Sequence, residues 1–243
     1  MNSRLRVSGI HLLCSIFLGL VALSIVYLIW YPEPFAVAIG VGKIFLILLV
    51  VDVVIGPILT FVVYKNGKKS LIFDLVIIAF LQGAAFLYGF HSIAVGRPVW
   101  IVFNVDRFDL VQASELDTRF LSDASPEFRH LSWIGPRWVA SKKPLDLQKR
   151  NQLIVESAVG GADLPQRPDL YIPLKEEAES IKLKARRLPE LEQYNKSEVL
   201  QSEFKKWPQA DAWLPLVAKA RSMAVLLNKE NGSVVTVVDL RPW

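Results

Sequence analysis

The stretch VVDVVIGPILT, from Val50 to Thr60, combines an apolar run with an ionisable side chain and a helix breaker. Asp52 lies inside the run, and Gly56 and Pro57 follow it. A charged side chain at the centre of a bilayer costs about 2.5–3.5 kcal/mol on insertion scales, so it usually faces protein or water. Pro57 lacks the N–H that would bond the Val53 carbonyl. The stretch therefore predicts a kinked, polar notch inside a membrane-spanning helix.

The notch lies in the second of three apolar segments that are long enough to span a bilayer. A hydrocarbon core of about 30 Å needs about 20 helical residues. The segments run from about Gly9 to Trp30, from about Val41 to Tyr64 and from about Leu71 to Ala94. The first segment is too long for the apolar part of a signal peptide and ends in aromatic residues, which favours an uncleaved anchor. Residues 1–96 are expected to form a transmembrane domain.

Basic residues flank these segments unequally and predict their orientation. The N-terminal tail carries Arg4 and Arg6, and the loop KNGKKS carries three lysines, whereas the loop YPEPFAVAIG carries no basic residue. Short cytoplasmic loops are enriched in Lys and Arg, so the N-terminus and the KNGKKS loop are expected in the cytoplasm. An odd number of spans then places residues 97–243 outside the bacterial inner membrane, as a periplasmic domain.

Charge excludes one class of partner. The chain has a net charge of +5, but residues 97–243 carry 22 of the 28 basic residues and 20 of the 23 acidic ones. A nearly balanced domain without a basic patch does not fit nucleic acid as a partner. The single cysteine, Cys14, cannot form an internal disulfide and does not reveal the compartment.

Residues 97–243 are predicted to form a small α+β domain with an antiparallel sheet. Runs of β-prone apolar residues predict four strands, over Val99–Phe103, Phe108–Val111, Ser222–Leu227 and Val234–Leu240. Asp106-Arg107 and Asn231-Gly232 fit the turns of two hairpins. Helices are expected over Leu145–Ser157, Glu176–Arg187 and Ser197–Trp207.

Motifs for catalysis are missing from the sequence. No GxSxG, HExxH, CxxC or phosphate-loop pattern occurs. His130 is the one histidine after residue 97, and an isolated histidine of this kind is expected to be an ordinary loop residue. We therefore expect neither catalytic residues nor a metal or cofactor site.

Small and polar residues repeat along one face of each apolar segment. Such stripes let membrane helices approach one another, because lipid gives no hydrophobic drive for their association. The candidate residues of the notch are Asp52, Gly56, Pro57, Thr60 and Gln82. The notch is expected to receive a proton, an ion or the transmembrane helix of another protein. The structural alternative is that Asp52 only forms a hydrogen bond to Gln82, and His11 is likewise expected to be structural.

Short motifs occur in series along the chain. They include Trp30, Tyr31 and Pro32, then Asp52, Gly56 and Pro57, then Asp74 and Gln82, then Arg97 and Pro98, and finally Asp106 and Arg107. This series resembles the type IV pilin accessory proteins of the TfpX/TfpZ type. The resemblance is dense over the apolar segments and the first outer strand, thins between about Ser114 and Pro215, and returns at the C-terminal hairpin.

The resemblance implies a non-enzymatic inner-membrane accessory protein or chaperone that supports a cognate type IV pilin. The implied partners are the major pilin subunit, the lipid bilayer and other pilus assembly proteins. The notch would hold the apolar helix of the pilin, and the outer domain would contact its head. One alternative is a small transporter or proton-coupled component that uses Asp52, Asp74 and Lys43, although three spans are few for a transport path. Another is a membrane-bound enzyme or sensor with an outer ligand domain.

Overall fold

The computed structural model describes residues 2–144 and 146–243, and the chain divides into two compact units. The first unit holds the residues up to Glu33 together with Val41–Gly96. The second unit holds Arg97–Trp243 together with the short segment Pro34–Gly40. This segment separates the first two apolar helices in the sequence, yet it belongs with the C-terminal part of the chain.

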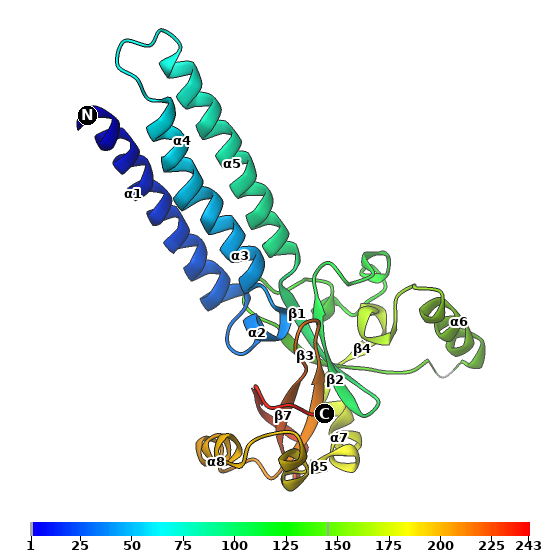
Figure 1. The fold of residues 1–243 in the computed structure, drawn as a ribbon. Coiled ribbons are helices and arrows are strands. Elements are labelled where there is room, and N and C mark those ends of the chain that lie inside the picture. The colour runs from blue at the N-terminus through cyan, green and yellow to red at the C-terminus, as the bar shows by residue number, and fades with distance from the viewer. Residues whose placement is uncertain (1, 145) are drawn as a thin grey trace. The chain divides into compact units, whose positions relative to one another are not determined.

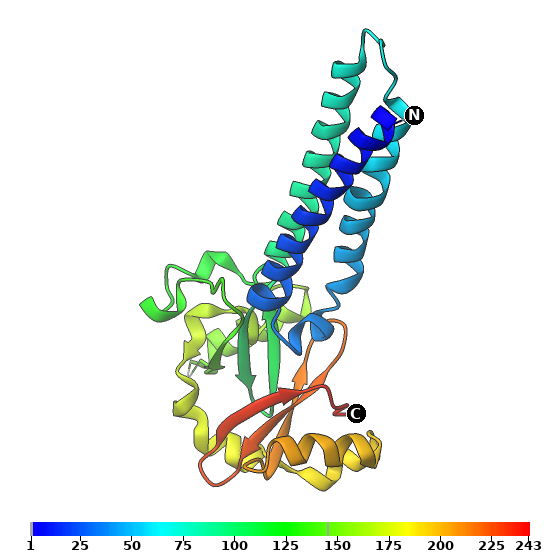
Figure 2. The same ribbon diagram turned by 90° about the vertical axis from the view of Figure 1, so that its left-hand side faces the viewer.

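Three long helices form the first unit (Figures 1 and 2). They are α1 (Asn2–Ser24) with a π-helical end (Ile25–Trp30); α3 (Gly42–Leu49), a π-helical segment (Val50–Ile55) and α4 (Gly56–Val63) in one continuous span; and α5 (Leu71–Val95). Within the described residues, these three helices are long and apolar enough to cross a membrane. They agree with the three segments expected from sequence, except that the first helix already begins at Asn2.

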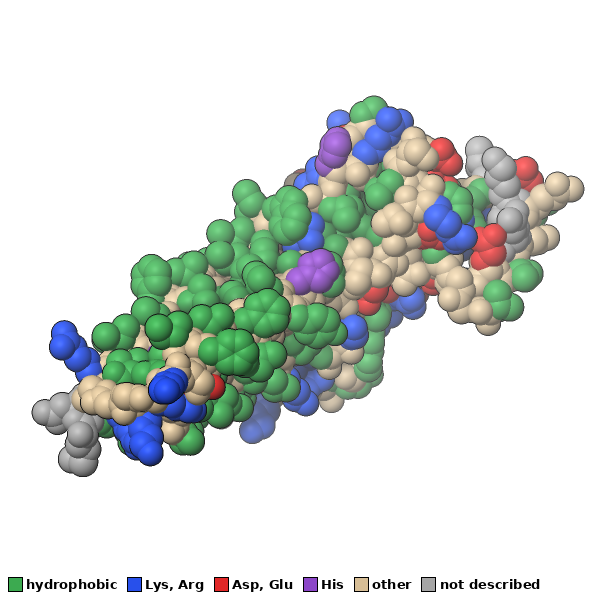
Figure 3. Space-filling view, turned by 90° about the horizontal axis from the view of Figure 1, so that it is seen from above, with side chains coloured by type: hydrophobic (Ala, Val, Ile, Leu, Met, Phe, Trp, Pro, Cys, Tyr) green, Lys and Arg blue, Asp and Glu red, His purple; other side chains and the backbone are tan. Residues whose placement is uncertain are grey.

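Apolar side chains cover the outside of these helices, as the green surface in Figure 3 shows. Lys and Arg side chains gather at the end of the unit that carries the N-terminus. Soluble monomers rarely expose apolar patches larger than a few hundred Å². Such a surface is typical of helices that lie in lipid.

A short helix, α2 (Phe35–Ile39), lies in the loop between the first two spans and belongs to the second unit. The Ala38 carbonyl accepts N–H hydrogen bonds from Ala220 at 2.9 Å and from Arg221 at 3.1 Å. The helix ends at Gly40, whose φ is +79°, and a Cβ there would lie 2.8 Å from the Ala220 Cβ. Both the left-handed backbone and the close approach favour glycine at this helix end.

The described part of the second unit contains an eight-stranded mixed sheet. Its strands are β1 (Pro98–Asn104), β2 (Arg107–Gln112), β3 (Arg137–Ser141), β4 (Tyr171–Ile172), β5 (Arg186–Arg187), β6 (Ala212–Val217), β7 (Met223–Asn228) and β8 (Ser233–Val238). Their order is β4-β3-β1-β2-β6-β7-β8, and β5 also pairs with β6. The expected antiparallel sheet is wrong in two places, because β1 pairs with β3 and β2 pairs with β6 in parallel. Both expected hairpins, β1–β2 and β7–β8, are present.

Strand β6 joins the two hairpins although it contains a proline. Prolines are mostly confined to sheet edges because they lack a backbone donor. Strands β2 and β5 pair with the same side of β6, and neither pairs with Pro215. β2 pairs with Leu216 and Val217, whereas β5 pairs with Ala212 and Trp213. On that side of β6, Pro215 falls between the two ladders.

Two of the expected helices are close to those observed. They are α6 (Leu147–Ala158) and α8 (Ser197–Lys206), while Leu145, where the first was expected to begin, lies outside the described residues. The expected helix over Glu176–Arg187 is wrong in its extent. A 3₁₀ turn (Leu174–Glu177) leads into α7 (Ala178–Lys184), and then β5 begins, because Arg186 and Arg187 pair with β6.

Candidate functional site

Asp52 is the most buried carboxylate of the first unit, with 6% of its surface exposed. It is the eleventh residue of the 22-residue span Gly42–Val63. The backbone around it winds as a π-helix over Val50–Ile55, and the Gly56 N–H bonds the Val51 carbonyl five residues earlier. Pro57 accounts for this winding, because it has no N–H with which to continue the α-helical pattern. Local π-helices of this kind often occur at functional sites.

The other notch residues on this span are covered by neighbouring helices. Gly56 lies against Gln82 of α5, and a Cβ at this glycine would collide with the amide of that side chain. The Pro57 carbonyl accepts a hydrogen bond of 2.8 Å from the Ser8 hydroxyl of α1. Thr60 Oγ1 lies 2.6 Å from His11 Nδ1. These three positions hold the helices together instead of opening into a cavity.

Asp52 and Gln82, by contrast, line an open cavity of about 440 Å³ in the first unit. Its lining comes from all three spans and includes His11, Cys14, Ser15 and Leu18 of α1 and Ala79, Gly83, Phe86 and Leu87 of α5. Asp52 also borders a second cavity, of about 280 Å³, between its own span and α5. The span that carries Asp52 packs on both α1 and α5, as Figure 1 illustrates. Asp52 therefore borders two cavities although only 6% of its surface is exposed.

The expected hydrogen bond between the Asp52 and Gln82 side chains is not formed. Gln82 Nε2 instead lies 3.5 Å from the backbone carbonyls of Val51 and Asp52. In the described part of the chain, Asp52 Oδ2 has no hydrogen-bond partner. A buried acceptor without a donor costs about 1–3 kcal/mol. The purely structural alternative for Asp52 thus lacks the bond on which it depended.

Motif positions near the ends of the spans have packing roles. Trp30 and Tyr31 are buried; the Trp30 ring lies 4.8 Å from that of Phe90, and the Tyr31 hydroxyl donates to the Ile93 carbonyl at 2.7 Å. Pro32 lies in the turn that follows, and is partly buried.

Asp74 has a different environment from Asp52. It forms an ion pair of 2.6 Å with Lys68 and accepts a hydrogen bond from Ser70 at 3.1 Å. Asp74 therefore lies in the first turn of α5, and its side chain already pairs with the loop that precedes this helix. Its distance from Leu71, three residues, places it near the end of the helix.

The remaining motif positions lie in the second unit. Arg97 is buried, its guanidinium lies 3.7 Å from the centroid of the Trp133 ring, and its Nε donates to the Ser132 carbonyl. Pro98 begins β1. Asp106 is exposed in the turn between β1 and β2, and Arg107 forms an ion pair of 3.2 Å with Asp109. These residues shape the first hairpin.

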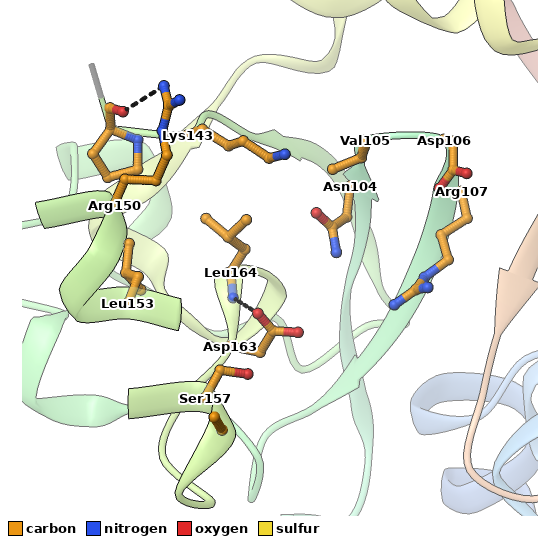
Figure 4. A pocket seen from close by; sticks show the side chains of 12 residues that line it. Asn104, Val105, Asp106, Arg107, Lys143, Arg150, Leu153, Ser157, Asp163 and Leu164 are labelled. Carbon is orange, nitrogen blue, oxygen red and sulfur yellow. Dashed lines mark hydrogen bonds between the residues drawn. The ribbon is translucent and has the colours of Figure 1, made fainter. Parts of the chain in front are cut away.

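A pocket of about 500 Å³, lined by both apolar and charged side chains, lies beside this hairpin (Figure 4). Arg107 and Asn104 line one side, and Lys143, Arg150 and Asp163 line the other. Next to it, burial raises the pKa of Asp109, while Arg107 and the Asn104 side chain oppose that shift. The described residues contain no group of three His, Cys, Asp or Glu side chains that could hold a metal ion.

Sequence reasoning missed several residues of the cavity in the first unit. Gly83 and Ala79, one helical turn apart on α5, both line it. Their small size was the available signal, because small residues at this spacing mark helix faces that other helices approach. His11 was predicted only as a structural residue of the first span, and its partner, Thr60, depends on how the helices pack.

Three apolar helices joined to a mixed-sheet domain are typical of a membrane-associated protein. The chain is 30% identical to "Fimbrial assembly protein, serogroup E1" of Dichelobacter nodosus, over 97% of this chain and 94% of that relative. It is also 30% identical to the serogroup I protein of the same organism, with the same coverage. This chain therefore belongs to the family of fimbrial assembly proteins.

Two further comparisons are consistent with that assignment. The family model described as "Fimbrial assembly protein FimB" matches residues 1–40. A third relative, "Fimbrial assembly protein, serogroups C1 and C2", is 34% identical over 46% of this chain and 86% of its own length. No solved structure matches the chain.

Proposed function

We propose that this chain is a non-enzymatic inner-membrane accessory protein that supports its cognate type IV pilin during pilus assembly. The relatives' role in fimbrial assembly supports the process. The observation that carries the proposal further is the cavity lined by all three spans. On its wall lies the buried Asp52, whose Oδ2 has no hydrogen-bond partner among the residues that the structure describes. A membrane protein that only anchors a soluble domain has no need for such a carboxylate, which is costly to bury.

The apolar helix of the unassembled pilin is the occupant that fits this cavity. A spanning segment in lipid must be helical, because its backbone groups have no other partners there. The open surface of α5 at Ala79 and Gly83 allows close approach of such a helix. Holding the helix in the bilayer would keep the pilin available for assembly, which is the role of a chaperone.

The second unit would then contact the soluble head of the pilin. Two arguments support a periplasmic location for this unit. The basic residues favour a cytoplasmic N-terminus, and α2 hydrogen-bonds to the chain at Ala220 and Arg221. Because α2 follows the first span and the C-terminal residues follow the third, both must lie on the same side of the membrane.

Cysteine labelling tests this orientation. In a Cys14→Ala background, Glu33→Cys and His130→Cys should react with a membrane-impermeant maleimide added to spheroplasts. Lys69→Cys should react only after lysis, since it lies in the loop between the second and third spans. Labelling of Lys69→Cys in intact spheroplasts, with protection of the other two sites, would reverse the proposed topology.

The positions of Asp52 and Asp74 argue against the alternative of a small transporter. Asp74 pairs with Lys68 near the helix end, about eight residues or roughly 12 Å of helical rise from the level of Asp52. The two carboxylates therefore do not form one polar site. No observation favours an enzyme or a sensor over a protein that binds another protein.

Co-purification provides the functional test. The tagged full-length chain, extracted from native membranes in mild detergent, should retain the major pilin, identified by mass spectrometry. An equally abundant inner-membrane protein with three spans serves as the control and should retain none. Absence of pilin from the tagged chain, with pilin present in the same membranes, contradicts the proposed function.

A further inference from the structure

Glycines in the three spans differ in whether a neighbouring helix occupies the space beside them. Gly19, Gly56 and Gly89 are filled by side chains of neighbouring helices: a Cβ would lie 2.9 Å from Leu49 at Gly19 and 2.9 Å from Leu48 at Gly89, and it would collide with Gln82 at Gly56. At Gly83 a Cβ would meet nothing within 4 Å. Gly19, Gly56 and Gly89 explain how the three helices pack together, and Gly83 has no such role.

Gly83 lies on the wall of the cavity that Asp52 borders. Ala79, four residues earlier on α5, lines the same cavity, and residues at this spacing share a helix face. A Gly/Ala face of this kind lets another helix bring its backbone close, which is the main source of attraction between helices in lipid. Since none of the described residues fills the space at Gly83, the face is open to a helix from outside the chain.

Asp52 adds an independent requirement. Only 6% of the surface of this residue is exposed, and Oδ2 receives no hydrogen bond from the described residues. Lipid tails have no donor, so they cannot satisfy it. A hydroxyl, an amide or a protonated carboxyl on a docked helix can, and a hydrogen bond of this kind inside a membrane contributes about 0.6–1.7 kcal/mol.

We propose that the Asp52 cavity binds one partner helix, which packs its backbone against Ala79 and Gly83 and places a hydrogen-bond donor at Asp52. This inference rests on the proposed function for the identity of the partner, the pilin, and it adds the face and the chemistry of recognition. The face formed by Ala79 and Gly83 leaves room for the backbone of the partner helix. The hydrogen bond from the donor to Asp52 makes binding selective for helices that carry such a donor. An apolar helix without a donor at that depth leaves Asp52 unsatisfied and binds less tightly.

Variants of the full-length chain test the inference through the amount of pilin that co-purifies. Gly83→Leu fills the open face and should lower the pilin yield by about tenfold. Asp52→Leu removes the acceptor and should lower it about three- to tenfold. Asp52→Asn keeps an acceptor oxygen and should retain most of the yield. Gly9→Leu is the matched control, because a Cβ at Gly9 also meets nothing within 4 Å and Gly9 does not line the cavity.

The outcomes separate this inference from the proposed function. If the unaltered chain retains pilin and both leucine variants retain it equally well, the inference is wrong and the proposed function stands. If the unaltered chain retains no pilin, both fail. If Gly83→Leu instead separates two copies of this chain, the cavity is a self-association site and the inference is overturned. Should Asp52→Leu fail to accumulate in the membrane, Gly83→Leu still decides the matter, because that site has room for a side chain.

Discussion

Trp100→Ala should lower the free energy of unfolding of the second unit by about 3–5 kcal/mol, the usual cost of truncating a large buried aromatic side chain. Trp100 is 1% exposed at the centre of β1. Its ring lies 5.5 Å from that of Tyr171 and 5.9 Å from that of Phe128, and the Arg137 guanidinium lies 4.2 Å from its centroid. These contacts join β1 to β3, to β4 and to the 3₁₀ turn at Phe128, so the cavity left by alanine cannot close easily.

Thermal unfolding of the purified full-length protein in detergent, followed by near-ultraviolet circular dichroism, measures this loss. For a unit of this size the expected fall in Tm is roughly 6–20 °C. Trp243→Ala is the control, since Trp243 is 57% exposed, and it should change stability by no more than about 0.5 kcal/mol. Equal effects of the two substitutions would mean that the Trp100 cluster does not hold the second unit together.

Gly56→Leu should disrupt the three-helix unit, at a cost of about 3 kcal/mol. A side chain at this position would displace the Gln82 amide from the carbonyls of Val51 and Asp52. It would also separate α5 from the span that carries Asp52. Loss of pilin binding in this variant would therefore reflect a damaged fold and would say little about the cavity itself.

The measurement is the amount of full-length protein in the membrane fraction together with its thermal unfolding in detergent. Gly83→Leu, on the same pair of helices, should match the unaltered protein in both, because the space at Gly83 is open. An undisturbed Gly56→Leu protein would show that the close contact between Gly56 and Gln82 is not needed for packing.

Sequence predicted the first unit well because its dominant signals are local. Three apolar runs of sufficient length predict three helices, and the combination of Asp52 with Pro57 predicts a backbone irregularity, which the structure shows as a π-helical segment. Which side of the notch stays open could not be predicted. Gly56 and Gly83 are both small residues in apolar helices, and the difference between them arises only from where Gln82 packs.

The second unit was less predictable because the order of strands in its sheet depends on pairing between segments far apart in the sequence. The two hairpins were recognised from continuous β-prone runs. Strands β3 and β6 pair in parallel with segments far away in the chain, which leaves no local periodicity to detect. The docking of α2 was missed for the same reason, since the ten-residue loop YPEPFAVAIG between two apolar spans gives no sign that it bonds to Ala220.

The central claim, that the cavity beside Asp52 holds the pilin helix, is tested most directly by site-specific photocrosslinking in the native host. A photoreactive phenylalanine analogue is placed at Leu18 or Leu87, which line the cavity, and at Leu13 or Phe80, which are exposed on the same two helices but do not line it. The account predicts adducts with the major pilin from Leu18 and Leu87 and little or none from Leu13 and Phe80. Equal yields from all four positions, or no pilin adduct at Leu18 and Leu87, would contradict it.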